Sequence, residues 1–308
     1  MTEPVITLDQ VSKFYGKVMG LNDISVTVDR GMTGLLGPNG AGKSTMMKLI
    51  TGQIRPSKGK VRVLGSRVWD NPSLYWDIGY CPEQDSFFPN TTGLEFVTLG
   101  ARLFGITGRE ATRAARKAIR KVEMERDMNR SIDGYSKGMR QRIKIAQGLV
   151  HDPRVLVLDE PLAGTDPIGR VKIMDLLFDL KKEGKDIIVS SHVLYEIERL
   201  TEEVIIINKG KLVAKGNIHD IRDSMDRFPL TIRLRTPQRR KFARLMADLK
   251  DVSTLSFTAG KDELLVTTRD PERFYGEFQS LVVKNGLRIS SIDSPDDNLD
   301  AIFKYLVE

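Results

Sequence analysis

Nine consecutive residues, 37–45, constrain the fold of this chain more than any other stretch. They read Gly-Pro-Asn-Gly-Ala-Gly-Lys-Ser-Thr, so two glycines enclose four residues and are followed by Lys and Ser. The apolar run before them, 32–36, has the length of a buried strand, and 46–50 after them has a helical pattern. A strand, a glycine-rich turn and a helix in this order are the context that a phosphate-binding loop requires.

Such a loop binds phosphate through its backbone. Glycines let successive N–H groups converge on phosphate oxygens, and the helix N-terminus adds its positive dipole end. Lys43 is expected to reach the terminal phosphates, and the hydroxyl of Ser44 to hold Mg²⁺. The alternative, a tight glycine turn without a ligand, is weak against a match of this length. We therefore predict a bound nucleoside triphosphate, held by Gly37, Pro38, Asn39, Gly40, Ala41, Gly42, Lys43, Ser44 and Thr45.

Bulk composition is that of an ordinary globular protein. The 308 residues are comfortable for two domains, with 40% hydrophobic and 29% charged residues. We find no apolar run near the roughly 20 residues that span a bilayer and no secretion signal at the start. The lone cysteine, Cys81, excludes an internal disulfide, fits a reducing cytoplasm and is interpreted as a packing residue. His151 and His219 fit no functional pattern and are interpreted as solvated loop residues.

The positive charge of the chain is concentrated in residues 93–150. The formal net charge is +7, and this stretch holds 13 Lys and Arg against 6 Asp and Glu. A capping box from Thr92 to Glu95 and apolar residues at spacings of three and four predict a helical insertion at about 90–150. Nucleic acid, an anionic membrane surface or a solvated helical face would each account for the charge. The nucleic-acid interpretation is weakened because no aromatic residues interleave with the basic ones.

Two acids follow a second apolar run. Residues 155–158 are typical of a parallel strand buried on both faces, and the run ends in Asp159 and Glu160. Asp159 would order a water in the Mg²⁺ shell, and Glu160 would accept a proton from an attacking water. The alternative is a pair of ordinary acids at the start of a loop. The phosphate loop earlier in the chain favours the catalytic interpretation.

Seven motifs occur in the order of an ABC-type ATPase domain, and the resemblance covers about residues 4–217. They are Tyr15-Gly16, residues 37–45, Gln84, residues 135–139, Asp159-Glu160, residues 164–166 and His192. The resemblance implies an α/β P-loop NTPase of the ABC ATPase type over residues 1–222, with the helical subdomain of about 90–150 inserted into it. It also implies that the nucleotide is ATP.

The resemblance assigns roles to further side chains. Tyr15 would stack on adenine, unless it is a surface aromatic in a hairpin. Gln84 would meet Mg²⁺ and the attacking water, and His192 would contact the γ-phosphate. The implied catalytic residues are Glu160, His192 and Gln84, and the implied metal ligands are Ser44, Gln84 and, through water, Asp159.

Residues 135–139 imply a second copy of the chain. Ser136, Lys137 and Gly138 open a helix, and the amides at a helix N-terminus form an anion site. In ABC ATPases this segment binds the γ-phosphate held by the other subunit, so Ser136 and Gly138 are expected to act in trans in a head-to-tail homodimer. The family pattern reads Leu-Ser-Gly-Gly-Gln, and Tyr135, Lys137 and Met139 depart from it. Lys137 adds a positive charge near the anion site.

Residues 228–308 have a pattern of their own. Strict alternation at 230–235 and helical spacing at 238–249 begin the order β-α-β-β-α-β, which is that of a small α+β ferredoxin-like domain. A last short helix is expected to carry Leu299, Ile302, Phe303 and Leu306. The segment resembles the C-terminal extension of bacterial ATPases that serve ABC-2-type permeases. We expect it to dimerise or to regulate.

The resemblance implies the ATP-binding subunit of an ABC transporter, similar to bacterial ABC-2-type exporters. Such a chain would work with separate integral-membrane permease subunits on the cytoplasmic face of the membrane, with no direct contact to nucleic acid. Phe87 and Phe88 lie where ABC ATPases receive a short permease helix, or else in the core of the insertion. One alternative is a soluble ABC ATPase acting on nucleic acid or the ribosome, although such proteins generally carry two ATPase domains or a long coiled coil. Another, a P-loop kinase or GTPase, does not explain Ser136 at a helix start.

Overall fold

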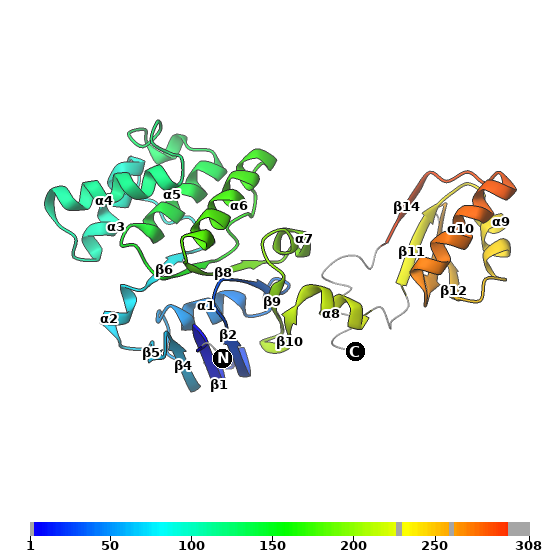
Figure 1. The fold of residues 1–308 in the computed structure, drawn as a ribbon, viewed down its shortest axis with the longest axis horizontal. Coiled ribbons are helices and arrows are strands. Elements are labelled where there is room, and N and C mark those ends of the chain that lie inside the picture. The colour runs from blue at the N-terminus through cyan, green and yellow to red at the C-terminus, as the bar shows by residue number, and fades with distance from the viewer. Residues whose placement is uncertain (1–2, 226–229, 259–261, 295–308) are drawn as a thin grey trace. The chain divides into compact units, whose positions relative to one another are not determined.

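A computed structural model describes residues 3–225, 230–258 and 262–294. The chain divides into two compact units, Met1–Asn217 and Ile218–Glu308 (Figure 1). Sequence analysis places the boundary between 222 and 228, whereas this division places helix α8 (Ile218–Met225) in the second unit.

A six-stranded sheet forms the centre of the first unit. Its strands lie in the order β10-β9-β3-β8-β7-β6, and all neighbours are parallel except β9 and β10. Every residue of β3, β7 and β8 is buried, as their continuous apolar character predicts for strands covered on both faces. The bounds are β3 Met32–Leu36, β6 Ile78–Cys81, β7 Val155–Leu158, β8 Asp186–Ser191, β9 Glu203–Asn208 and β10 Lys211–Asn217.

A second, antiparallel sheet contributes to the same core. Its order is β2-β1-β4-β5, and the apolar side chains on its inner face meet those of α1 (Lys43–Ile50). Alternation of buried and exposed residues is clearest in β4, where Val61 and Val63 point inward. The bounds are β1 Ile6–Tyr15, β2 Val18–Val28, β4 Lys58–Val63 and β5 Ser66–Arg67.

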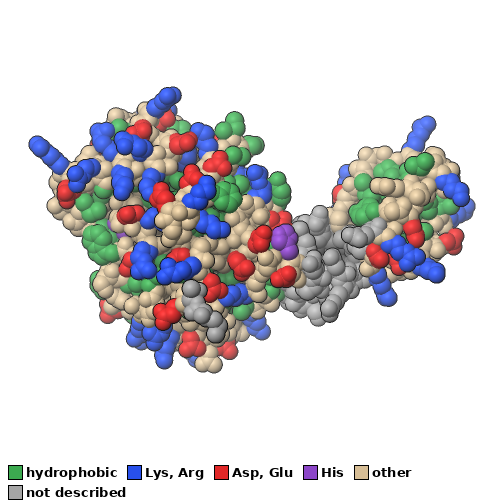
Figure 2. Space-filling view, viewed as in Figure 1, with side chains coloured by type: hydrophobic (Ala, Val, Ile, Leu, Met, Phe, Trp, Pro, Cys, Tyr) green, Lys and Arg blue, Asp and Glu red, His purple; other side chains and the backbone are tan. Residues whose placement is uncertain are grey.

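The predicted helical insertion comprises α3 (Gly93–Leu103), α4 (Gly108–Lys121) and α5 (Lys137–Leu149), which lie together in Figure 1. The capping box is present: Glu95 N–H donates to the Thr92 hydroxyl, and Thr92 N–H donates to the Glu95 carboxylate. Figure 2 shows Lys and Arg side chains over this region with acids between them. Several of these charges form ion pairs on the solvated surface of the helices, so part of the basic charge is neutralised within the insertion.

Helix α5 packs unusually close to the outermost strand, β6. At Gly79 on the strand, an added side-chain carbon would overlap the carbonyl of Gly148 on the helix. Gly79 therefore needs to be glycine, and a side chain at Gly148 would be tight, 3.3 Å from the carbonyl oxygen of Tyr80. The remaining helices of this unit are α2 (Pro72–Tyr75), the short 3₁₀ turn Ile132–Gly134, α6 (Pro167–Lys182) and α7 (Leu194–Glu198).

The second unit has a core and a sheet of its own. Its strands lie in the antiparallel order β12-β13-β11-β14, and from β11 to β14 the element order is the predicted β-α-β-β-α-β. Phe242, Phe274 and Phe278 anchor the core between sheet and helices. The bounds are β11 Leu230–Arg235, α9 Arg239–Met246, β12 Val252–Phe257, β13 Glu263–Thr268, α10 Pro271–Asn285 and β14 Ser291–Asp293.

Two predictions for the second unit stay untested. The short helix expected from Leu299 lies outside the described residues, and the assignment of this unit to the ferredoxin-like fold remains a prediction. A search of the described ranges for a helix of membrane-spanning length and apolarity finds none.

Candidate functional site

The phosphate loop connects β3 to α1 as predicted. It borders a cavity of about 450 Å³ whose lining includes residues 38–45. Gly40 and Gly42 have φ angles of 80° and 108°, in the region that favours glycine. At Gly42 a side chain would also overlap the backbone of Gly20. The loop is therefore shaped by glycine at the point where α1 begins.

Tyr15 lies at the opposite rim of this cavity. The hairpin between β1 and β2 places its side chain, 47% exposed, beside Val18 and Met19. An aromatic ring this exposed at a cavity can stack on a planar base, and the Lys13 ammonium lies 5.3 Å from the ring centroid. Tyr15 is thus both a hairpin aromatic and a wall of the cavity, as either sequence interpretation would have it.

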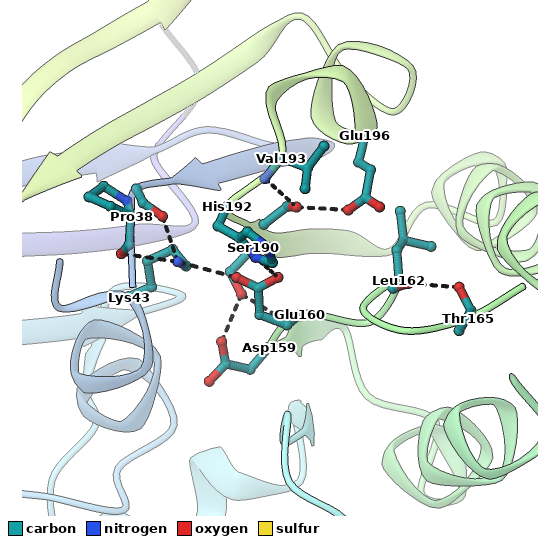
Figure 3. A network of polar contacts seen from close by, with 12 residues as sticks. Pro38, Lys43, Asp159, Glu160, Leu162, Thr165, Ser190, His192, Val193 and Glu196 are labelled. Carbon is teal, nitrogen blue, oxygen red and sulfur yellow. Dashed lines mark hydrogen bonds and ion pairs between the residues drawn. The ribbon is translucent and has the colours of Figure 1, made fainter. Parts of the chain in front are cut away.

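Lys43 and Glu160 line the cavity, and His192 contacts Glu160 beside them (Figure 3). The Lys43 ammonium lies 3.2 Å from Glu160 Oε1 and donates to the carbonyl of Gly37 at 2.6 Å. His192 Nδ1 lies 2.9 Å from the other carboxylate oxygen of Glu160. Glu160 itself has a φ of 50°, a strained value for a residue with a side chain, in a turn at the end of β7. Three strand ends thus bring the predicted acid, histidine and lysine together.

Ser190, on β8, holds the two acids in place. Its hydroxyl accepts a hydrogen bond from Glu160 N–H at 2.9 Å and donates one to Asp159 Oδ1 at 2.7 Å. The side chain is fully buried. Sequence analysis did not single out Ser190, although a serine within the apolar run of β8 is the signal that would have found it.

Glu83 lines the cavity, whereas the cavity lining does not include Gln84. Both residues follow β6 after Pro82, and the turn directs the first of them toward the phosphate loop. The role that the resemblance gives to Gln84 therefore has a second candidate, one residue earlier. An acid at this position would contribute a charged ligand in place of a neutral one.

The side chains near the loop suit a magnesium nucleotide. Ser44 and Glu83 share the cavity lining, and Asp159 lies directly ahead of Glu160 on the turn after β7. These are oxygen donors, and Mg²⁺ is usually held by one or two protein carboxylates together with substrate phosphates. Within the described ranges, no cluster of three or more His, Cys, Asp or Glu could hold a metal ion without such phosphates. The donor set therefore fits Mg²⁺ bound together with a nucleotide.

Ser136 caps α5, away from this cavity. Its hydroxyl accepts from Met139 N–H at 3.3 Å, and neither Ser136 nor Gly138 belongs to the cavity lining. The Lys137 ammonium lies against Gly164, where an added side-chain carbon would collide with it. Lys137 thus links the start of α5 to the predicted 164–166 loop of the same chain.

His151 is not the solvated loop residue that the sequence suggested. Its ring stacks on Phe104 with centroids 3.6 Å apart, and Nε2 lies 3.1 Å from the carbonyl of Ile78. Burial lowers the pKa of this histidine, because the protonated form loses hydration there. Its packing partners are distant in sequence, which explains why local pattern missed them.

The sequence of this chain is similar to those of known proteins. Residues 21–163 match the family described as ABC transporter. The chain is 31% identical to the bacitracin transport ATP-binding protein BcrA of Enterococcus faecalis, in a match that covers 99% of this chain and 97% of that protein. The chain belongs to the family of ABC transporter ATP-binding proteins. This membership confirms the predicted ABC ATPase fold of the first unit.

Two further comparisons extend the likeness of this ABC ATPase. An uncharacterized ABC transporter ATP-binding protein of Nostoc sp. is 38% identical over 69% of this chain, which spans 64% of the length of that relative. A solved dimeric structure of a bacterial ABC transporter cassette is 27% identical, with a TM-score of 0.64, and covers 69% of this chain and 98% of its own.

Proposed function

We propose that this ABC ATPase hydrolyses ATP at the interface of a homodimer and so drives transport through separate integral-membrane permease subunits. One observation carries the proposal: a single chain supplies only part of the expected site. The phosphate loop, Glu83 and Glu160 line one cavity, but Ser136 and Gly138 do not. A second copy, placed head to tail, would bring its Ser136 and Gly138 to the γ-phosphate.

Within each site, Glu160 accepts the proton of the attacking water. His192 Nδ1 holds one carboxylate oxygen at 2.9 Å, which orients Glu160 for that transfer. Lys43 and the loop amides neutralise the charge that develops on the transferred phosphoryl group. When bound, Mg²⁺ would be held by Ser44, by Glu83 or Gln84, and through water by Asp159, and would neutralise phosphate charge.

Nucleotide binding has to rearrange the resting contacts of Lys43. Its ammonium is shared between the Glu160 carboxylate and the carbonyls of Gly37 and Pro38. A phosphate in the cavity competes for the same protons and carries more charge than either carbonyl. Glu160 is then released from Lys43 and free to act as a base.

Glu160→Gln tests both the base and the dimer. The variant keeps the shape of the side chain and loses its proton affinity, so we expect ATP to bind and hydrolysis to be lost. The ATP-bound variant should elute as a dimer at a concentration where the nucleotide-free chain is a monomer. Glu203→Gln, an exposed change on β9, is the matched control. A variant that stays monomeric at saturating ATP contradicts the dimer, and normal hydrolysis removes Glu160 as the base.

We infer that a permease docks in a hollow between the insertion and the sheet, on the cytoplasmic face of the membrane. The cavity holds about 340 Å³, and Leu103 on its lining is 77% exposed. Trp76, whose ring contacts Phe104 of the lining, is 48% exposed. A pocket with an apolar rim suits a short amphipathic helix. Phe87 contacts Phe96 in the insertion, while Phe88 remains 57% exposed. The cavity is lined by Thr51, Gln53, Tyr75, Ile78, Tyr80, Pro82, Gly100, Leu103, Phe104, Gln147, Gly148 and His151.

Leu103→Glu tests this docking surface. A charge at the rim should abolish co-purification of membrane proteins with the ATPase. Arg113→Glu, on the exposed outer face of α4, is the control and should retain them. Equal recovery of permease with both variants contradicts docking at this hollow.

We also propose that the second unit dimerises or regulates. Removing residues from 228 onward without any change in dimerisation, ATPase rate or transport contradicts that role.

A further inference from the structure

Lys144 is a buried cation on α5 that does not belong to the lining of the nucleotide cavity. The residue is only 2% exposed. Its ammonium lies 2.9 Å from each of three oxygens: the carbonyls of Pro82 and Glu83 and the carboxylate of Asp85. All three belong to the segment that follows β6 and carries Glu83 into the nucleotide cavity.

Two hydrogen bonds and one ion pair hold this ammonium. A lysine has three N–H donors and no acceptor, and here it donates to the carbonyls of Pro82 and Glu83 and pairs with the Asp85 carboxylate. Burying an ion costs several kcal/mol unless its partners compensate, so the arrangement is stable only while the loop keeps this shape. Asp85 is 36% exposed and closes the contact at its solvent side.

Neighbouring positions of α5 hold the same segment. Arg140 Nη1 lies 3.8 Å from the second carboxylate oxygen of Asp85, and Gln141 Nε2 lies 3.8 Å from Cys81 Sγ. Gln141 is itself buried. One face of α5 therefore contacts residues 81–85 along its length, with Lys144 as the best-satisfied contact.

We propose that Lys144 is a positioning residue for ATP hydrolysis, which fixes the 82–85 segment so that the Glu83 carboxylate faces the phosphate loop. The same lysine ties this segment to a helix whose other end carries Ser136. Eight residues separate the two positions on α5, a rise of about 12 Å. Lys144 thereby connects the metal side of one ATP site to the segment that serves the second site. The second half of this statement rests on the proposed homodimer.

If Lys144 were only structural, replacing it would have a different effect on nucleotide binding from that expected for a positioning residue. A structural lysine stabilises the whole unit, so its loss weakens nucleotide binding with and without metal alike. A positioning lysine acts through Glu83, so its loss weakens only what depends on Mg²⁺. The two roles therefore separate in the metal dependence of nucleotide affinity and in kcat against KM.

The test uses Lys144→Met in the full chain, with fluorescent ATP analogue binding measured in EDTA and in Mg²⁺. We expect affinity in EDTA within twofold of the unaltered chain, and the gain in affinity on adding Mg²⁺ to fall at least fivefold. The kcat for ATP should fall at least tenfold, with KM changed less than threefold. Lys144→Arg, which keeps the charge, should recover part of kcat. Lys172→Met is the matched control, because Lys172 pairs with Glu123 on an exposed surface.

Four outcomes overturn the role. Unchanged Mg²⁺ dependence and kcat in Lys144→Met would remove it, and so would an equal loss of affinity in EDTA and Mg²⁺. If Lys144→Met does not fold, Asp85→Asn tests the role instead, because Asp85 is partly exposed and its replacement should leave the fold intact. Asp85→Asn should reduce kcat and the Mg²⁺ gain in the same direction, and unchanged values contradict the role. An unaltered chain that fails to hydrolyse ATP contradicts the proposed function and this role with it.

Discussion

The ammonium of Lys43 and the carboxylate of Glu160 form a buried ion pair, 3.2 Å apart, between the phosphate loop and the end of β7. Both residues are about 6% exposed. A pair of this kind brings its two elements together before any nucleotide arrives. It also makes each partner costly to remove alone, because the other charge then stays buried without compensation.

Lys43→Met should lower the free energy of unfolding by about 3 kcal/mol, since it leaves the Glu160 carboxylate without its cation. Adding Glu160→Gln should recover part of that loss, because the uncompensated charge is gone. Urea unfolding of the single and double variants measures the difference. Lys182→Met, which breaks an exposed pair with Asp179, should change stability by less than about 0.5 kcal/mol. Additive losses in the double variant would contradict the coupling.

Ser190→Ala should lower both stability and turnover. The change leaves Glu160 N–H and Asp159 Oδ1 without the partner that joins them, at a cost of about 2 kcal/mol. We expect kcat to fall more than ATP affinity, because the acids lose their orientation while the phosphate loop is untouched. Thermal unfolding and steady-state ATPase assays measure the two effects. Ser25→Ala removes an exposed contact of the same type and serves as the control.

Gly164→Ala should reduce the kcat for ATP more than a substitution elsewhere that strains the backbone equally. Gly164 has a φ of 64°, and an added carbon would also collide with the ammonium of Lys137. Gly184→Ala is the matched control, with a φ of 86° and open space around it. Each should lose about 1 kcal/mol of stability from strain, but only Gly164→Ala should change ATPase kcat. Equal kcat in both variants would show that the Lys137 contact has no part in turnover.

Cys81 should resist alkylation in the folded protein. Burial raises the pKa of its thiol to about 12, and the thiolate is the reactive form. This raised pKa keeps the Cys81 thiol protonated from neutral pH to well above pH 9. Mass spectrometry after iodoacetamide at pH 8 should find the chain unmodified when folded and modified once in denaturant. Rapid labelling of the folded chain would contradict the burial of Cys81.

Much of this arrangement follows from sequence because it is local. The phosphate loop, the capping box at Thr92 and the buried run 155–158 depend on neighbours within a few residues, and the structure contains each of them. The meeting of Lys43 with Glu160 is also predictable, because parallel strands end at one edge of their sheet.

The rest depends on contacts between distant segments. Successive side chains point in different directions, so Pro82 marks a turn without saying whether Glu83 or Gln84 faces the cavity. Sequence analysis chose the second, and the cavity lining contains the first. Lys144 finds its three oxygens some sixty residues earlier in the chain, and no helical pattern reveals them.

The close approach of Gly79 and Gly148 also affects how much of the terminal strand β6 is accessible to other chains. The six-stranded sheet ends at β6, and a terminal strand offers unpaired peptide groups to any other strand that can reach them. Helix α5 lies against that strand with no side chain between the two backbones at this point. The helix that carries the expected ATP-sensing segment therefore also covers a face of this terminal strand. Loss of this packing would therefore impair ATP hydrolysis and also leave backbone of β6 accessible to other chains.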